Sequence, residues 1–100
     1  MSTTRTTQGW TFLTNHAHAL LCIAEDPDIR IQDIADRVGI TLRAAQGIVG
    51  ELVRDGYVAK TRVGRRNRYE IRPDLPFRHP LEADRSIGVL LSALADPSAG

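Results

Sequence analysis

The fold follows from residues 33–41, which read DIADRVGIT and stand between two segments with helical periodicity. Apolar residues recur at helical spacing up to this point, so a helix is predicted over residues 32–38. Gly39 permits the left-handed backbone that ends a helix, and Thr41 has the side chain of a good N-cap for a new one. Two helices separated only by residues 39–41 form a helix-turn-helix unit.

The second helix of this unit is predicted over residues 41–55 and ends before Gly56. Its apolar side chains fall on one face, and they are Ala45, Ile48, Val49, Leu52 and Val53. With that face turned inward, small and polar residues remain outside. Gly47 and Gly50 lie on this outer face, where each costs about 1 kcal/mol relative to alanine. They are either tolerated there or let the backbone approach a partner closely.

Upstream, a helix is predicted over residues 15–25, with Asn15 as its N-cap. The Asp-Pro-Asp sequence at residues 26–28 ends it, because proline disfavours the α conformation in the residue before it. The apolar residues before this helix are expected to pack on a neighbouring element, and they are Trp10, Phe12 and Leu13. Residues 1–8 are polar without periodicity and are interpreted as a flexible tail.

Downstream, two segments rich in β-branched and aromatic residues are predicted to be strands, over residues 57–63 and 68–72. Residues 64–67 lie between them as a hairpin turn. Three helices followed by a hairpin make a winged helix-turn-helix domain, which we assign to residues 9–72.

The C-terminal part is predicted to be a linker and a helix. Prolines make residues 73–79 a stiff, extended linker. A helix over residues 80–95 is expected to begin with Pro80, which suits a first helical turn, and residues 96–100 form a frayed end. The expected fold class is therefore mainly α with a small β-hairpin (α+β), a winged helix-turn-helix plus a C-terminal helix.

Positive charge is concentrated in the middle of the chain, although the net charge of the whole chain is only +1. Residues 41–72 carry eight Lys and Arg against three acidic residues, a net charge of +5. Residues 1–40 carry three against five and residues 73–100 carry two against four, so each flank is at −2. One basic surface on a mildly acidic body is typical of a phosphate-binding protein.

The segment from Ile31 to Ile71 resembles the winged helix-turn-helix transcriptional regulators of the MarR and ArsR type. The resemblance lies in DIADRVGIT at residues 33–41, LVRDGYV at residues 52–58 and VGRRNRY at residues 63–69. It implies a dimeric repressor or activator of transcription that binds double-stranded DNA, with the helix over residues 41–55 in the major groove. It also implies that the hairpin lies against the minor groove or the adjacent backbone.

The side chains of these two elements have the chemistry that DNA contact needs. Arg43 matches guanine O6 and N7, Gln46 matches adenine N6 and N7, and Thr41 at the helix N-terminus suits a phosphate. Arginines around Gly64 suit a minor groove or flanking phosphates. The predicted DNA-binding residues are Thr41, Arg43, Ala44, Gln46, Gly47, Gly50, Arg54, Arg62, Arg65, Arg66, Asn67 and Arg68.

A homodimer is also expected, because similar regulators often dimerise through terminal helices. The predicted dimer contacts are Trp10, Phe12, Leu81, Ile87, Leu90, Leu91 and Leu94. A symmetric dimer would hold two recognition helices about 34 Å apart, on a near-palindromic DNA site.

His18 and Cys22 lie four residues apart on a predicted helix, a spacing at which two side chains can share a metal ion. Two ligands do not make a site, and the predicted terminal helix adds only His79, Glu82 and Asp84, so no metal site and no cofactor are expected. Cys22 is the single cysteine and is expected to be a small buried apolar residue. A redox trigger would need a thiol from another subunit or a small molecule.

Other function classes find little support in the sequence. No stretch approaches the roughly 18 to 20 apolar residues of a membrane span, and no secretory signal is present, so a cytoplasmic location without membrane contact is expected. No Gly-rich phosphate loop or Ser-His-Asp arrangement indicates an enzyme. The remaining alternative is a winged-helix module that binds an acidic protein surface instead of DNA. The sequence leaves open whether a small-molecule effector controls binding.

Overall fold

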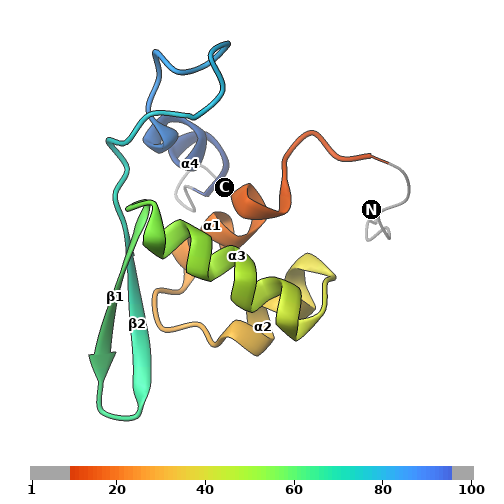
Figure 1. Cartoon of the computed structure of the whole chain (residues 1–100), viewed down its shortest axis with the longest axis vertical. Coiled ribbons are helices and arrows are strands. Elements are labelled where there is room, and N and C mark those ends of the chain that lie inside the picture. Colours follow the sequence, from red (N-terminus) through yellow and green to blue (C-terminus); the bar gives the residue numbers. More distant parts are fainter. Residues whose placement is uncertain (1–9, 96–100) are drawn as a thin grey trace.

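The structure, a computed structural model, describes residues 10–95 of the 100-residue chain. In chain order the elements are α1 (Asn15–Glu25), α2 (Ile31–Val38), α3 (Leu42–Arg54), β1 (Val58–Val63), β2 (Arg66–Ile71) and α4 (Ile87–Ala95). Figure 1 shows α1, α2 and α3 packed together, with the hairpin of β1 and β2 projecting from them and α4 at the opposite end. This arrangement confirms the predicted winged helix-turn-helix with a C-terminal helix. The tail predicted for residues 1–8 and the frayed end predicted for residues 96–100 lie outside the described residues.

The turn between α2 and α3 is built as the sequence predicts. Gly39 has a φ of 86°, and its amide donates to the Ala35 carbonyl at 2.8 Å. Thr41 then caps α3, because its Oγ1 accepts a hydrogen bond from the Ala44 amide at 3.0 Å. A left-handed glycine and, two positions later, a hydroxyl cap fix the angle between the two helices.

The helix α1 has its predicted bounds but a different cap. Thr14 has the extended backbone of an N-cap, and its Oγ1 accepts a hydrogen bond from the Ala17 amide at 3.2 Å. The prediction of Asn15 as the cap is therefore wrong by one residue: Asn15 is the first helical residue, and its Oδ1 lies 3.4 Å from Nδ1 of His18. Both residue types cap well, so the sequence did not distinguish them.

The core lies between α1, α2 and α3 and is closed by the base of the hairpin and by the start of α4. Its buried residues are Ala19, Leu20, Cys22, Ile23, Ile29, Ile34, Ala35, Ala45, Val49, Leu52, Val58, Tyr69 and Ile87. The inward face predicted for α3 is confirmed, since three of its five apolar residues are buried and the other two are packed against the core. Burying side chains of this size stabilises the fold by about 1.5–3 kcal/mol each.

The hairpin is tighter than predicted. The strands β1 and β2 are antiparallel and pair from Val58 with Ile71 to Val63 with Arg66. The prediction of a four-residue turn over residues 64–67 is therefore wrong, because only Gly64 and Arg65 connect the strands. Gly64 has a φ of 64°, which two-residue hairpin turns require at their first central position.

The C-terminal helix begins later than predicted. It starts at Ile87, and the prediction of a helix from residue 80 is wrong for the seven residues before it. The backbone reverses there instead: the amide of Phe77 donates to the Arg85 carbonyl at 3.0 Å, and the amide of Ile87 donates to the Leu75 carbonyl at 2.9 Å. These backbone groups therefore form hydrogen bonds with another segment of the chain instead of within a longer helix.

The first described residues do not pack on a neighbouring element. The side chains of Trp10 and Phe12 are 74% and 91% exposed, so the prediction that they pack within the domain is wrong. Their rings contact each other edge to face, with centroids 4.8 Å apart. Figure 1 shows the reason: this segment leaves the start of α1 on a side that no other element covers. Within residues 10–95, no helix is long and apolar enough to cross a membrane.

We expect the substitution Gly88→Ala to lower the free energy of unfolding by about 1–3 kcal/mol, because overpacking strains a closed contact. The added Cβ would lie 2.9 Å from the Pro73 carbonyl oxygen, at the place where α4 docks. Gly50→Ala is the matched control: nothing lies within 4 Å of its added Cβ. That control should gain up to about 1 kcal/mol from helix propensity. Urea denaturation measures both, and a Gly88→Ala protein as stable as the parent would contradict the contact.

Candidate nucleic-acid interface

The solvent side of α3 carries all the residues predicted for it. They are Thr41, Arg43, Ala44, Gln46, Gly47, Gly50 and Arg54, and all are exposed. They share this side because the apolar residues of α3 face α1 and α2, which leaves one stripe of the helix uncovered. The surface is convex and follows one helix, which is the shape that fits a major groove.

The middle of this stripe has no side chains. Arg43, Gly47, Gly50 and Arg54 follow one another at spacings of four, three and four residues, so they lie nearly in line along the helix. A Cβ at either glycine would meet nothing within 4 Å. Packing inside the chain therefore does not require these glycines. The result is a strip of bare backbone with an arginine at each end.

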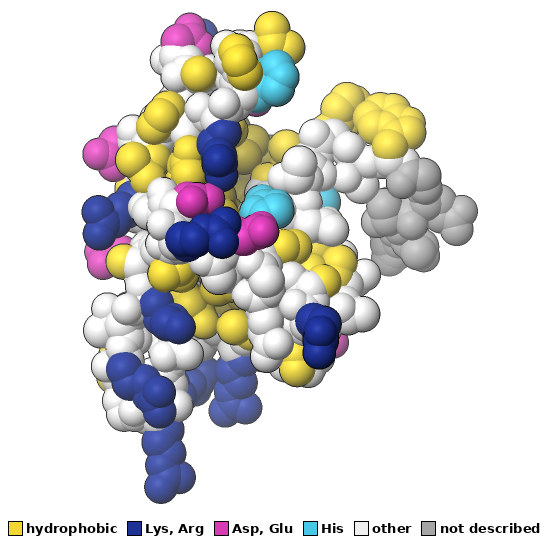
Figure 2. Space-filling model, viewed as in Figure 1, with side chains coloured by type: hydrophobic (Ala, Val, Ile, Leu, Met, Phe, Trp, Pro, Cys, Tyr) yellow, Lys and Arg dark blue, Asp and Glu magenta, His cyan; other side chains and the backbone are white. Residues whose placement is uncertain are grey.

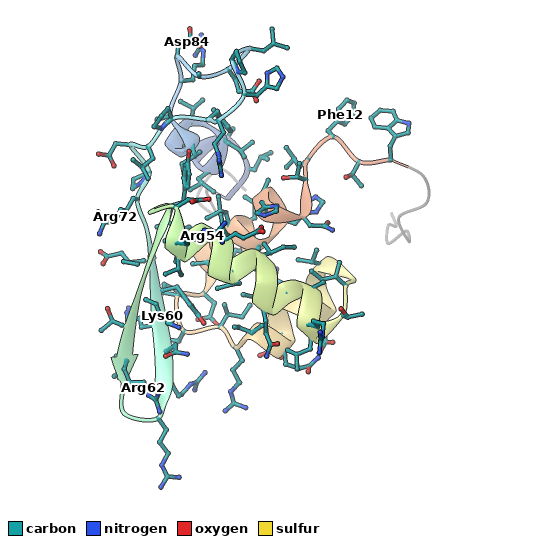
Figure 3. All side chains as sticks on the ribbon, in the orientation of Figure 1. Phe12, Arg54, Lys60, Arg62, Arg72 and Asp84 are labelled. Carbon is teal, nitrogen blue, oxygen red and sulfur yellow. The ribbon has the colours of Figure 1, made fainter. Side chains whose placement is uncertain are left out.

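We call β1, β2 and their turn the wing. Two cations of the wing lie on the same side of the molecule as α3. Lys60 pairs with Tyr69 and Arg62 pairs with Asn67 across the hairpin, and paired residues share a face of the sheet. Tyr69 is buried against the helices, so this is the face turned toward the body of the domain. Figure 3 shows Arg54, Lys60 and Arg62 in succession from the end of α3 to the wing tip.

Lys60 was missed as a site residue by the sequence reasoning. The signal was present, because residues 60 and 62 alternate with residues 59 and 61 and must share a face of a strand. The charge of Lys60 is part of the net charge of +5 over residues 41–72, but the face of the hairpin on which Lys60 lies was not predicted. Within residues 10–95 the side chain of Lys60 has no hydrogen-bond or ion-pair partner, and the same holds for Arg43 and for Arg65 in the turn.

The other two wing arginines lie on the opposite face of the hairpin and contact the loop between α1 and α2. Arg68 pairs across the sheet with Thr61 and Arg66 pairs with Val63, one residue out of phase with Lys60 and Arg62. The Nη1 atom of Arg68 donates to both carboxylate oxygens of Asp28 at 3.1 Å. Arg66 donates to the Asp28 backbone carbonyl at 2.9 Å. The four wing arginines predicted as one group are thus separated: Arg62 lies on one face, Arg66 and Arg68 lie on the other, and Arg65 lies in the turn.

The acidic residues at the end of α3 each have a neighbouring partner. Asp55 lies 2.8 Å from Nη1 of Arg78 and 3.6 Å from Nε of Arg54. Glu51 lies 2.6 Å from Nε2 of His16 on α1. Figure 2 shows Lys and Arg side chains along the face formed by α3 and the wing, with the acidic groups of α3 in contact with basic ones. The negative charge of Asp55 is therefore compensated by two arginines, and Glu51 is hydrogen-bonded to His16.

The sequence candidates for metal and redox chemistry are not brought together. No group of three or more His, Cys, Asp or Glu side chains that could hold a metal ion occurs in the described part of the chain. His79, Glu82 and Asp84 were expected on a terminal helix, which is wrong, because they lie in turns before α4. Cys22 is buried, and burial raises the pKa of its thiol above the ordinary value although Arg37 opposes this effect. The thiol is therefore mainly protonated at neutral pH.

Comparison with known proteins found a matching family model and a similar solved structure. Residues 17–59, from α1 into β1, match the family model of the winged helix-turn-helix DNA-binding domain. A solved structure of similar fold is the zinc-dependent MarR family transcriptional regulator AdcR in its Zn(II)-bound state, with 18% identity and a TM-score of 0.48. The match covers 65% of this chain and 47% of AdcR, so this chain spans about half the length of that protein. No curated protein matches the chain.

The family match and the observed order of elements agree over the same residues. The matched segment contains both helices of the helix-turn-helix unit and reaches the first strand of the wing. The chain therefore has a winged helix-turn-helix fold, and its residues 17–59 are similar to the winged helix-turn-helix DNA-binding domain.

Proposed function

We propose that this protein is a transcriptional regulator that binds duplex DNA directly, with α3 in the major groove and the wing on the adjacent backbone or minor groove. The observation that carries the proposal is the common orientation of the exposed stripe of α3 and the wing cations Lys60 and Arg62. We propose that such a protein acts in the cytoplasm, and it needs no catalytic group and no cofactor.

Base recognition is assigned to the side chains at the N-terminal half of α3. Arg43 is placed for a bidentate contact with guanine and Gln46 for one with adenine, each worth about 1–3 kcal/mol of discrimination. Both side chains are exposed. Thr41 and the first-turn amides of α3 are assigned to a phosphate, because the N-terminus of a helix attracts anions.

Backbone contact is assigned to Lys60, Arg62 and Arg65 in the wing and to Arg54 at the end of α3. The turn projects Arg65 beyond the paired strands, and the Nε of Arg62 donates to the Gly64 carbonyl at 3.1 Å, which leaves its Nη groups for phosphates. Long-range attraction to the duplex is favoured because the acidic groups nearby are paired.

Replacing Lys60, Arg62 or Arg65 singly with alanine should weaken binding to every duplex sequence and reduce the slope of log affinity against log salt by about one unit each. The matched control is Arg85→Ala, next to Asp84 at the end of the molecule away from the wing (Figure 3). Fluorescence anisotropy with a labelled duplex, between about 50 and 200 mM salt, measures the slopes. Failure of the parent protein to bind any duplex at low salt would favour a protein-binding module instead.

We expect Gly50→Ala, which should stabilise the fold, to weaken DNA binding by about tenfold, equivalent to about 1.4 kcal/mol. The added methyl group would stand in the middle of the bare strip and hold the helix away from the base edges. Gly47→Ala should act in the same way. The measurement compares affinity for a bound duplex with stability in urea. An affinity equal to or above that of the parent would show that these glycines are merely tolerated.

We also propose that a second copy of the chain covers the exposed apolar residues, as in a symmetric dimer. The predicted dimer contacts differ in exposure: Ile87 is buried within its own chain, and Leu90 and Leu91 are half-buried. Trp10, Phe12, Leu81 and Leu94 are exposed. Phe12 and Leu90 line a groove of 820 Å³ between the start of α1 and the segment before α4. Large exposed aromatic groups beside an apolar groove favour a covering partner.

The double substitution Trp10→Ala with Phe12→Ala should convert a dimer to a monomer, because it removes the two largest exposed apolar side chains. Sedimentation equilibrium at micromolar concentration measures the mass. Val63→Ala serves as a control, since it removes another exposed apolar side chain, on the wing. A parent protein that sediments as a monomer would reject the dimer.

A further inference from the structure

The loop between α1 and α2 runs along the outer edge of β2 and is bonded to it. The buried Tyr69 donates its amide hydrogen to the Pro27 carbonyl at 2.8 Å. The next residue toward the wing tip, Arg68, donates to both carboxylate oxygens of Asp28. Arg66, still nearer the tip, donates to the backbone carbonyl of Asp28. Consecutive residues of this loop therefore hold three residues of one strand.

The loop is itself fixed in place. Ile29 is 5% exposed and is part of the core, and its amide donates to the Asp26 carbonyl at 3.0 Å. The Asp26 carboxylate accepts a hydrogen bond from the Asp28 amide, also at 3.0 Å. Asp28 thus presents its carboxylate from a rigid turn that is anchored in the body of the domain.

The outer part of the wing has no other polar attachment. Within the described residues, every hydrogen bond from residues 60–68 to a residue outside the hairpin ends on Asp28. Apolar contact holds only the base of the hairpin, where Val58 and Tyr69 are buried. A two-stranded ribbon has little stiffness of its own. The angle of its outer half relative to α3 therefore depends on Asp28.

We propose that Asp28 is a positioning residue for DNA binding, an inference that rests on the proposed function. It holds Arg66 and Arg68 on one face of the wing, and this keeps Lys60 and Arg62 on the other face turned to the same duplex as α3. Arg66 and Arg68 then act through Asp28 and make no DNA contact of their own. An acidic residue on the basic side of the molecule would thus strengthen DNA binding.

Simple electrostatics predicts the opposite effect of Asp28 on DNA binding. Loss of a negative charge near phosphates should strengthen binding, and if Asp28 only masks two DNA-binding arginines, its loss should also steepen the salt dependence. Positioning predicts weaker binding with a shallower salt dependence, because wing contacts are lost. The substitution Asp28→Asn keeps the size of the side chain, removes the charge and separates these two outcomes.

The first measurement uses the protein without DNA. Amide hydrogen exchange in Asp28→Asn should be at least about tenfold faster at Tyr69 than in the parent, because the bond to the Pro27 carbonyl opens more often. The amide of Val49 in α3 is the internal control and should not change. Equal exchange at Tyr69 in both proteins would overturn the proposal, whether or not the protein binds DNA.

The second measurement uses a fluorescein-labelled duplex of random sequence. Asp28→Asn and Arg68→Gln should each bind about tenfold more weakly with a salt slope shallower by about one to two units, and the double variant should be no weaker than either single one. Asp33→Asn, which removes an exposed acidic charge from α2, is the matched control and should bind as well as the parent or better.

Tighter binding by Asp28→Asn, or a further loss when Arg68→Gln is added to it, would overturn the positioning role. A parent protein that binds no duplex would reject the proposed function, while hydrogen exchange would still decide whether Asp28 holds the wing.

Discussion

The burial of one face of α3 is the constraint on which the rest of this domain depends. Ala45, Val49 and Leu52 fill the space between α1 and α2, so α3 cannot rotate about its axis without exposing them. That packing decides which side chains of the helix meet solvent. Arg43 and Arg54 are on the outside because the apolar residues are on the inside. The same contacts that stabilise the fold therefore orient the exposed face of α3, to which we assign DNA binding.

In the hairpin, the alternation of side chains along each strand has the same effect as the burial of one face of α3. Tyr69 and Val58 are buried at its base, and this burial fixes which face of the ribbon turns toward the helices. The alternation then carries Lys60 out on one face and Arg68 on the other. A run of basic residues that looks uniform in the sequence thus becomes two groups with different partners, one exposed beside α3 and one held by the loop before α2.

Prediction from the sequence succeeded where the interactions are local. The helix-turn-helix unit was found because Gly39 and Thr41 act within a few residues of themselves, and the inward face of α3 was found because helical periodicity is a local property. Prediction from the sequence failed where the backbone forms hydrogen bonds with another segment of the chain instead of within a helix. The residues before Ile87 have helical character, yet their neighbours pair with the segment around Phe77.

The sequence by itself determined the order of the elements, the inward face of α3 and the concentration of positive charge between residues 41 and 72. These follow from propensity, periodicity and composition, which a short window contains. Only the tertiary structure decided the partner of each arginine and the exposure of Trp10 and Phe12. The reason is physical: an ion pair joins residues such as Asp28 and Arg68 that are forty positions apart, and their proximity exists only after the core has formed.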